Sequence, residues 1–392
     1  MKNVIKATAL CSVLASVITG CSKDSEETIP ESVTIKTPAG GFMADRFKTL
    51  RLSISTTVTN GTWEWKVDGQ TVSNDSVYYF ISDKPGAHEV SITVSNGMAS
   101  ASTSATIQVS KETANYSNKV FKVFDFQTAP GQFVNTMPMW EEGKTEAQMI
   151  ARAESDIKGG LGVHLGAFGG YVVVGFDHAI MNVPGQASFK VLGNAFNNWS
   201  EPGIIEVAVD KNGNGLPDDE WYEIAGSEYN KPKTIKNYEI TYYKPDEAKT
   251  PVTSEDFPYH TDLEYIKWTD NKGGSGYVRK NLFHSQSYYP QWKGSSITFK
   301  GTKISDETVV DQSGSGSYFV SPALEFGYAD NWPNNDEKNV IKLDWAVDRN
   351  GKPVKLSGVH FIRVYTGMLG DAGWLGEVST EFMNIEDLNL AK

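Results

Sequence analysis

Residues 191–224 read VLGNAFNNWSEPGIIEVAVDKNGNGLPDDEWYEI, and the middle of this stretch decides the class of fold. Residues 204–209, IIEVAV, form a β-branched run, which is typical of a mostly buried strand. Residues 210–220 follow at once, with short oxygen-bearing side chains at every second position and glycines that permit a tight turn. The stretch therefore predicts a strand, a polar loop and a second strand that begins near Trp221.

The loop at residues 210–220 resembles the first nine positions of an EF-hand calcium loop, with Gly215 at the turn position. The ligands implied by this resemblance are Asp210, Asn212, Asn214, the carbonyl of Leu216, and Asp218. Trp221 occupies the position of the bidentate glutamate, so Glu220 or Glu223 would have to close the site. The alternative is an Asn/Gly/Asp turn that binds nothing. Calcium is the one cofactor that the sequence suggests.

Residues 1–20 have the pattern of a secretion signal. Lys2 and Lys6 precede an apolar run that is too short to span a bilayer, and small residues then lead to Cys21. This arrangement resembles a bacterial lipobox, in which cleavage leaves Cys21 as the lipidated N-terminus. An ordinary secretory signal with a chance cysteine is the alternative. The resemblance implies a protein that a lipid anchors to the membrane.

Residues 21–32 are a polar, acidic spacer without apolar periodicity, which predicts a solvated linker. Acidic residues directly after Cys21 resemble the surface-export signal of lipoproteins from the Bacteroidota. This implies an outer-membrane protein that faces outward, and a plain linker facing the periplasm is the alternative. The other cysteine, Cys11, lies in the signal, so one mature chain can form no disulfide.

The charge of the chain limits its partners. Removing residues 1–20 takes away two lysines and no acidic residue, so 36 basic side chains become 34 against 48 acidic ones, a charge of −14. Nucleic acids and anionic lipid surfaces require a basic face, so this charge argues against both as partners. It is compatible with cations and with neutral ligands.

The length beyond the signal exceeds what one core usually fills, so two domains are expected. Strand-like alternation occurs at residues 50–54, 62–67 and 89–94. Asp68-Gly69 and Asn96-Gly97 are hairpin signals between such runs. With Trp63-x-Trp65, this order makes residues 33–110 resemble a PKD or related Ig-like β-sandwich. The resemblance implies a spacer that lifts a second domain off the membrane.

Residues 116–392 are expected to form a large β-sandwich of jelly-roll type, because short β patterns recur in them without a constant period. These patterns lie at residues 120–126, 171–176, 204–209, 238–243, 296–299 and 360–365. The one helix candidate, residues 145–155, is short. The chain is thus predicted to be all-β, with a small PKD/Ig-like sandwich followed by a large jelly-roll-type sandwich.

The sequence contains no HExxH, GxSxG or Walker A motif, and the histidines of residues 116–392 are scattered singly. Acidic residues are abundant, so a glycosidase-like carboxylate pair stays open as an alternative. The sequence singles out no catalytic residue. We therefore expect a protein that is not an enzyme.

Aromatic residues are the better guide to a ligand site. Eight of the ten tryptophans lie in residues 116–392, which is more than a core requires. Three of them sit in polar loop-like segments, where binding residues concentrate. An aromatic plate beside Asn and Asp suits a sugar ring or a planar cofactor, whereas a core or capping role is the alternative for each. The expected ligand-binding residues are Trp292, Trp332, Trp374, Tyr289, Asn331 and Asp371.

Residues 193–229 and residues 361–388, FIRVYTGMLGDAGWLGEVSTEFMNIEDL, resemble a group of Bacteroidota cell-surface lipoproteins that join a PKD-like module to a β-rich C-terminal domain. Such proteins are often encoded beside TonB-dependent uptake systems, some of which serve corrinoid capture. The resemblance implies capture of an extracellular nutrient, a glycan or a corrinoid, for a TonB-dependent transporter or another uptake lipoprotein. A glycan hydrolase and a structural or adhesive surface protein are the alternatives.

The lipid anchor can be tested with Cys21→Ala. Without lipidation the chain has no other predicted attachment, so the variant should leave the membrane fraction and appear in the soluble fraction. Fractionation followed by immunoblotting measures this, with the unaltered chain as control. Retention of the variant in salt-washed membranes would contradict the anchor.

Overall fold

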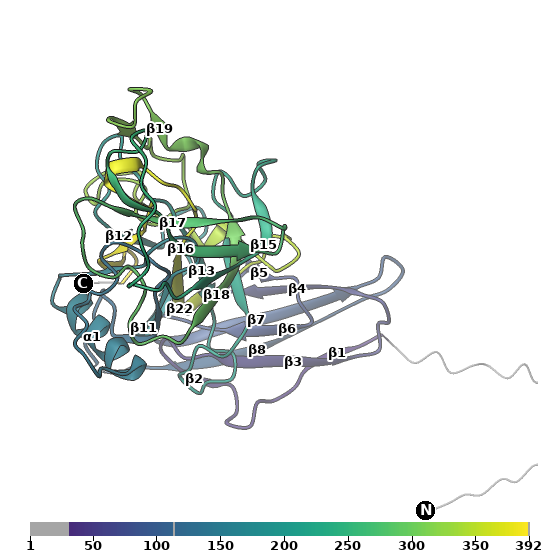
Figure 1. Ribbon diagram of the computed structural model, residues 1–392. Coiled ribbons are helices and arrows are strands. Elements are labelled where there is room, and N and C mark those ends of the chain that lie inside the picture. Colours follow the sequence, from purple (N-terminus) through teal and green to yellow (C-terminus); the bar gives the residue numbers. More distant parts are fainter. Residues whose placement is uncertain (1–30, 113, 391–392) are drawn as a thin grey trace, which may run out of the picture.

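The structure is a computed structural model that describes residues 31–112 and 114–390 (Figure 1). The signal, Cys21 and most of the acidic spacer lie outside these residues. Within them, α1 (Glu146–Lys158) is the one α-helix, and the rest of the regular structure is strand apart from three short 3-10 turns. The prediction of an all-β protein is confirmed. No helix in the described residues combines the length and apolar character needed to cross a membrane.

Residues 33–110 form two sheets that enclose one core. The three-stranded sheet has the order β1 (Val33–Ile35), β3 (Leu50–Thr56), β6 (Val77–Phe80), and the five-stranded sheet has the order β2 (Met43–Asp45), β8 (Ser100–Ser110), β7 (Gly86–Ser95), β4 (Thr62–Val67), β5 (Gln70–Ser73). Leu52 and Trp65, one from each sheet, are both fully buried in the shared core. Asp68 and Gly69 join β4 to β5 with φ of 48° and 83°, the left-handed geometry that favours glycine in a tight hairpin.

A six-stranded antiparallel sheet is the centre of the larger part of the chain. Its order is β21 (Ala346–Val347), β14 (Trp221–Ile224), β13 (Gly203–Ala208), β22 (Gly358–Thr366), β11 (Tyr171–Met181), β9 (Lys122–Gln127). The strand predicted at residues 204–209 is β13, and the strand predicted to begin near Trp221 is β14. The two are neighbours, as expected of strands joined by one loop.

A four-stranded sheet and smaller pieces surround this centre. The four-stranded sheet has the order β17 (Ser275–Asn281), β16 (His260–Asp270), β15 (Ile235–Tyr243), β18 (Ser296–Lys303). Three two-stranded pairs are β10 (Val163–His164) with β23 (Glu381–Phe382), β12 (Phe189–Leu192) with β24 (Asn384–Asp387), and β19 (Val310–Asp311) with β20 (Phe319–Val320). The 3-10 turns are η1 (Asp306–Thr308), η2 (Leu343–Trp345) and η3 (Gly373–Leu375).

The central sheet is buried on both faces, which explains the continuous apolar run of β13. Ile205 and Val207 point to one face and join a core cluster that includes Ile157 of α1. Ile204 points to the other face and joins a cluster with Tyr242 of the four-stranded sheet. Because successive side chains of a strand alternate between faces, a strand covered on both sides has to be apolar at nearly every position.

The predicted helix at residues 145–155 is α1, which extends to Lys158. Thr145 caps its first turn and shares a capping box with Gln148, which satisfies backbone N–H groups that the helix leaves free. Lys158 pairs with Glu154 at 2.7 Å, four residues earlier in the helix. The helix therefore continues three residues beyond the predicted range.

The two parts of the chain share buried contacts. Phe47 and Ile81, from the smaller part, belong to the main core cluster of the larger part. The Phe47 carbonyl lies 3.0 Å from Nε2 of His360, and the Phe47 ring packs edge-on against His178, with centroids 5.3 Å apart. In Figure 1 the purple and blue strands of residues 33–110 accordingly lie directly against the larger part.

His178 lies at the centre of this contact, between two carboxylates. Its ring nitrogens lie 2.7 Å from Asp177 Oδ1 and 2.8 Å from Asp387 Oδ2, and the side chain is completely buried. Burial alone would lower the pKa of His178, but the hydrogen bonds to Asp387 and Asp177 outweigh it, and the pKa is raised. The protonated imidazole therefore stabilises the folded state.

The stability contributed by His178 should depend on pH. Since its pKa is raised in the folded state, the contribution is fully present below about pH 6.5, the ordinary value, and is lost as the pH rises through the folded pKa. Urea unfolding of the unaltered chain and of the His178→Gln variant, carried out at several pH values across this range, measures this contribution. The difference in unfolding free energy between them should shrink as the pH rises. A difference that stays constant with pH would contradict a charged His178.

Candidate functional site

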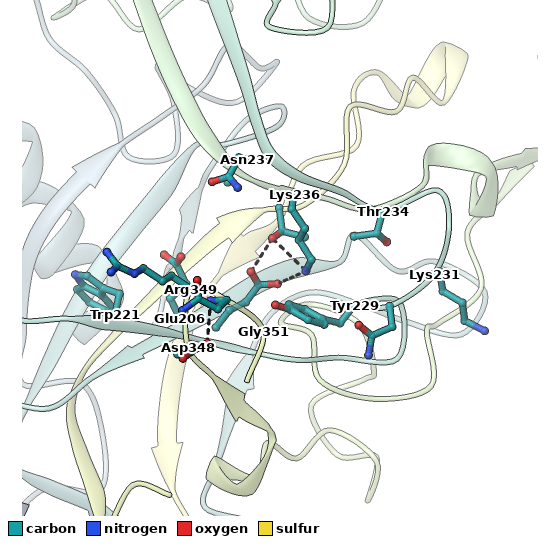
Figure 2. Close-up of a pocket in the computed structure, with 15 residues that line it drawn as sticks. Glu206, Trp221, Tyr229, Lys231, Thr234, Lys236, Asn237, Asp348, Arg349 and Gly351 are labelled. Atoms are coloured by element: carbon teal, nitrogen blue, oxygen red, sulfur yellow. Dashed lines mark hydrogen bonds and ion pairs between the residues drawn. The ribbon is translucent and has the colours of Figure 1, made fainter. Parts of the chain in front are cut away.

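A cleft of about 550 Å³ opens between the central sheet and the four-stranded sheet (Figure 2). Its walls come from β13 and β14 on one side and from β15 and β18 on the other, with two loops at the rim. The lining residues are Glu206, Trp221, Glu223, Tyr229, Asn230, Lys231, Thr234, Lys236, Asn237, Gly301, Thr302, Asp348, Arg349, Asn350 and Gly351. None of these side chains is aliphatic.

The strand register places two carboxylates side by side in this cleft. Glu206 of β13 lies directly opposite Glu223 of β14, so both side chains leave the same face of the sheet. Arg363 Nη1 lies 3.1 Å from Glu206, and Lys236 Nζ lies 3.3 Å from Glu223. Thr302 donates a hydrogen bond of 2.6 Å to Glu223. Each carboxylate is thus held in place by a cationic partner.

Partial exclusion of water changes the proton affinity of these groups. Burial raises the pKa of Glu206, although Arg363 opposes the shift. Burial likewise raises the pKa of Glu223 against the effect of Lys236, and it lowers the pKa of Lys236. Groups in such surroundings make stronger hydrogen bonds than groups in bulk water. The cleft can therefore hold a polar ligand through few contacts.

Two aromatic rings complete the lining. Lys236 Nζ lies 2.9 Å from the centroid of the Tyr229 ring, and Figure 2 shows these two side chains next to each other. Trp221 is partly exposed in the same cleft. Arg349 and Asn350 come from the loop after β21. Flat rings beside planar polar groups can bind a ring that carries hydroxyl groups.

None of the six expected ligand-binding residues lines this cleft. The available signal was an acidic residue inside each of two otherwise apolar strands, Glu206 in IIEVAV and Glu223 in WYEI. A charge in a buried strand requires a partner. The partners Arg363 and Lys236 are far away in the sequence, so the pattern alone could not identify the pair.

Two of the expected ligand-binding residues lie in the interior. Tyr289 is fully buried, and its hydroxyl donates to the Gly294 carbonyl at 2.9 Å. Asn331 is 1% exposed and exchanges hydrogen bonds of 2.7 and 2.8 Å with the backbone of Leu324. In this structure neither side chain can contact a ligand from solvent, because internal packing and hydrogen bonds already occupy both.

The three selected tryptophans have different neighbours. Trp292 packs against the main core cluster, Lys338 Nζ lies 4.3 Å from the ring of Trp332, and Trp374 contacts Phe283 with ring centroids 6.1 Å apart. No ring contact in residues 31–112 and 114–390 links the three to one another. The structure therefore does not assemble them into one stacked platform.

Asp371 lines a second, smaller pocket of about 370 Å³. Its Oδ2 atom lies 3.7 Å from Nε2 of His260, a buried histidine in the same pocket. Arg279 also lines this pocket, above the ring of Phe257. Of the six expected ligand-binding residues, Asp371 lies in a pocket, and Trp374 lies close to it because Gly373 is also part of the lining.

The loop at residues 210–220 brings most of its expected calcium ligands together. Oδ1 of Asp210 accepts from the backbone N–H of Gly213 at 2.7 Å, and its Oδ2 accepts from Gly215 at 3.0 Å. The side-chain amides of Asn212 and Asn214 donate to the two oxygens of Asp218 at 3.0 and 2.9 Å. These contacts also suit a turn without metal, so calcium in this loop stays a prediction.

The two residues considered for closing the loop point elsewhere. Glu220 Oε2 lies 3.0 Å from Lys211 Nζ and accepts from the hydroxyl of Tyr222 at 2.8 Å. Glu223 faces the cleft described above. Leu216, the expected carbonyl ligand, is 48% exposed. A cation in this loop would have to be coordinated by residues at the first nine positions of the loop and by water.

Comparison with known proteins adds no family. No protein-family model matches the chain, and no curated protein matches it. A quinonprotein alcohol dehydrogenase-like protein from Bacteroides thetaiotaomicron is 15% identical over 26% of this chain and 22% of its own, with a TM-score of 0.17. Carbohydrate-binding modules of the β-sandwich superfamily are 11% identical over 93% of this chain and 100% of theirs, with a TM-score of 0.17.

A SusE-like protein is 9% identical over 91% of this chain and 96% of its own, with a TM-score of 0.19. An endo-β-1,4-mannanase from Thermotoga petrophila is also similar. This chain spans about a fifth of the length of the mannanase and of the alcohol dehydrogenase-like protein. TM-scores this low assign neither a fold nor a site to this chain.

Replacing Tyr289 and Trp374 one at a time by alanine should distinguish an interior ring from a surface ring by the loss of stability. Tyr289→Ala removes a fully buried ring and should lower the free energy of unfolding by roughly 3 to 5 kcal/mol. Trp374→Ala removes a ring that is 37% exposed and should cost about 1 kcal/mol or less. Urea denaturation of both variants tests this. Equal losses would contradict the positions described here.

Proposed function

We propose that this chain is a lipid-anchored surface protein that binds a neutral glycan, without turnover, in the cleft between β14 and β15 and supports its TonB-dependent uptake. The cleft lining is the observation that carries the binding function. The lipid at Cys21, the outward-facing outer-membrane location and the transporter partner rest on the sequence patterns described above.

The size of the cleft supports a small polar ligand. A volume of about 550 Å³ lies within the range of roughly 300 to 1,000 Å³ that small-molecule sites occupy. Two of the 15 lining residues are aromatic, Trp221 and Tyr229, and the others are polar, charged or glycine. A ligand that carries hydroxyl groups around a ring matches this combination better than a large planar corrinoid does, because a corrinoid would require wider apolar walls.

The balance of charge in the cleft supports a neutral ligand. Three acidic side chains line it, Glu206, Glu223 and Asp348, and three basic side chains do so, Lys231, Lys236 and Arg349. A cleft with equal numbers of each sign selects neither an anion nor a cation by its net field. The acidic character of the whole chain further disfavours polyanionic glycans.

The Glu206–Glu223 pair favours a second candidate function, hydrolysis of a glycosidic bond. A glycosidase uses two carboxyl groups, one of which is a general acid with a raised pKa, and burial raises the pKa of both Glu206 and Glu223. Both groups, however, project from neighbouring strands of one wall of the cleft, and each already pairs with a cation. A glycosidase pair flanks the bond that it cleaves, so binding is the better supported function.

Binding in the cleft is tested by titrating neutral oligosaccharides into the full chain and measuring affinity by calorimetry. Trp221→Ala and Glu223→Gln should each weaken binding about tenfold, which corresponds to about 1.4 kcal/mol. The matched control is Tyr277→Ala, which removes an aromatic ring that is 39% exposed on β17, outside the cleft. The control should bind like the unaltered chain.

Two outcomes would contradict this function. If a glycan binds the two cleft variants and the unaltered chain equally well, the ligand lies elsewhere. If the chain releases reducing ends from an oligosaccharide and Glu206→Gln abolishes this release, the protein is a hydrolase. Melting temperatures of all variants should be recorded so that a loss of folding is not mistaken for a loss of binding.

A further inference from the structure

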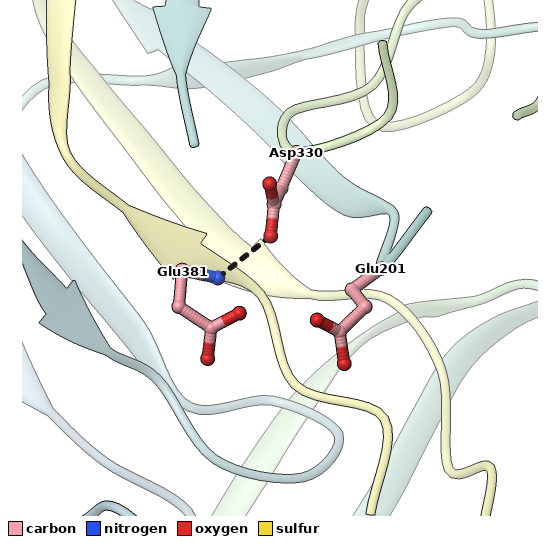
Figure 3. A group of neighbouring side chains, drawn as sticks. All are labelled: Glu201, Asp330 and Glu381. Carbon is pink, nitrogen blue, oxygen red and sulfur yellow. Dashed lines mark hydrogen bonds between the residues drawn. The ribbon is translucent and has the colours of Figure 1, made fainter. Parts of the chain in front are cut away.

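Three buried carboxylates meet at the beginning of β13, outside the cleft (Figure 3). They are Glu201, Asp330 and Glu381, and each offers an oxygen within 4.8 Å of an oxygen of the others. Their side chains come from three distant segments of the sequence. Glu201 is 8% exposed, Asp330 1% and Glu381 6%, so water does not screen their charges. This group is called the carboxylate cluster below.

Backbone N–H groups fix two members of the carboxylate cluster. Asp330 Oδ1 accepts from Asn194 and Ala195, each at 2.8 Å, and its Oδ2 accepts from Glu381 at 2.9 Å. Glu201 accepts from the N–H of Ser379 at 3.1 Å. A carboxylate oxygen has two lone pairs, so these bonds orient the groups and leave acceptor capacity for a further partner.

The negative charge of the cluster is poorly compensated. His164 is the one basic side chain that contacts it among the described residues, with Nδ1 2.6 Å from Glu381 Oε1 and Nε2 3.2 Å from Glu377 Oε1. Glu377 thereby adds a fourth buried carboxylate. Ionised carboxylates in such a place require a counter-charge.

Two buried oxygens provide an independent indication of a ligand site. Oε2 of Glu381 and Oε2 of Glu377 have no hydrogen-bond partner, although both side chains are more than nine-tenths buried. An unsatisfied buried acceptor costs free energy, so native proteins seldom leave one without a partner or a bound ion. Figure 3 shows the carboxylates of Glu381 and Glu201 facing each other, so a cation between them would contact both.

We propose that Glu201, Asp330 and Glu381 bind one calcium ion that ties together the segments around β13 and β23. Calcium lies 2.3 to 2.6 Å from its oxygen ligands, so two ligands on opposite sides of the ion are about 4.6 to 5.2 Å apart. The spacing of at most 4.8 Å in the cluster fits one such ion. The ligands are all hard oxygens and both nitrogens of His164 are already paired, which disfavours zinc and copper.

The location gives this ion a structural role. The Glu201 N–H donates to the Asp330 carbonyl at 3.0 Å, and the Gly203 N–H donates to the Ala329 carbonyl at 2.9 Å. The cluster therefore lies where the loop that contains Asp330 pairs with the start of β13. An ion there would hold the start of the central strand against two segments from the last third of the chain.

The test uses the full chain, stripped with chelator and then titrated with calcium chloride. Calcium at a hundredfold excess over its Kd should raise the melting temperature by at least about 4 °C, since it binds only the folded state. Glu201→Gln should lose this rise. The matched control is Asp218→Asn, which alters the exposed loop at residues 210–220 and leaves the cluster intact. It should keep the rise and retain one calcium per chain by elemental analysis.

If Glu201→Gln does not fold, Asp218→Asn still tests the proposal. This variant keeps the carboxylate cluster intact and removes one expected calcium ligand of the loop at residues 210–220. Loss of bound calcium and of the thermal shift in Asp218→Asn would place the ion in the loop and overturn the proposal. No bound calcium and no thermal shift in the unaltered chain would overturn it as well. Neither result depends on the glycan cleft.

Discussion

The burial of both faces of the central sheet is the constraint on which the rest of this structure depends. β13 and β22 lie in the middle of that sheet, and each alternates residues between two core clusters, as Val364 and Tyr365 do in β22. Every polar side chain in these strands needs a hydrogen-bonding or ionic partner within the protein, because water cannot supply one. The position of the cleft follows from this rule. Glu206 and Glu223 leave the sheet at the edge of the four-stranded sheet, where Arg363 and Lys236 compensate them.

The same electrostatic requirement separates the cleft from the carboxylate cluster. In the cleft, acidic and basic side chains are matched in number, and the groups keep access to solvent. At the cluster, His164 contacts Glu381 and the neighbouring Glu377, and one oxygen of each of these two carboxylates has no partner. A balanced site can accept a neutral molecule, whereas an unbalanced buried site attracts a cation. The same physical rule therefore favours different kinds of ligand at these two places near β13.

The contact between the two parts of the chain shows how residues 33–110 contribute to the core of the larger part. Phe47 has a positive φ of 59° and lies in the loop after β2, from which its ring reaches the main core cluster of the larger part and packs against His178. The ring covers an imidazole held between two carboxylates. Residues 33–110 therefore have their own core around Trp65 and also cover His178 of the larger part.

The sequence by itself determined the local features of this protein. The β-branched run of β13, the Asp68-Gly69 turn and the start of α1 at Thr145 each follow from the conformational preferences of a few neighbouring residues. These preferences act over short distances, so a single sequence displays them. The all-β class follows from their sum.

Only the tertiary structure decided which side chains share a site. Tyr289 and Asn331 have polar neighbours in the sequence, yet they are buried because other segments cover them. Glu206 meets Glu223 through strand register, and Glu201 meets Asp330 and Glu381 through the pairing of three distant segments. The pattern of a sequence does not reveal such contacts, because a side chain's burial and charge partners depend on residues that lie close only after the chain has folded.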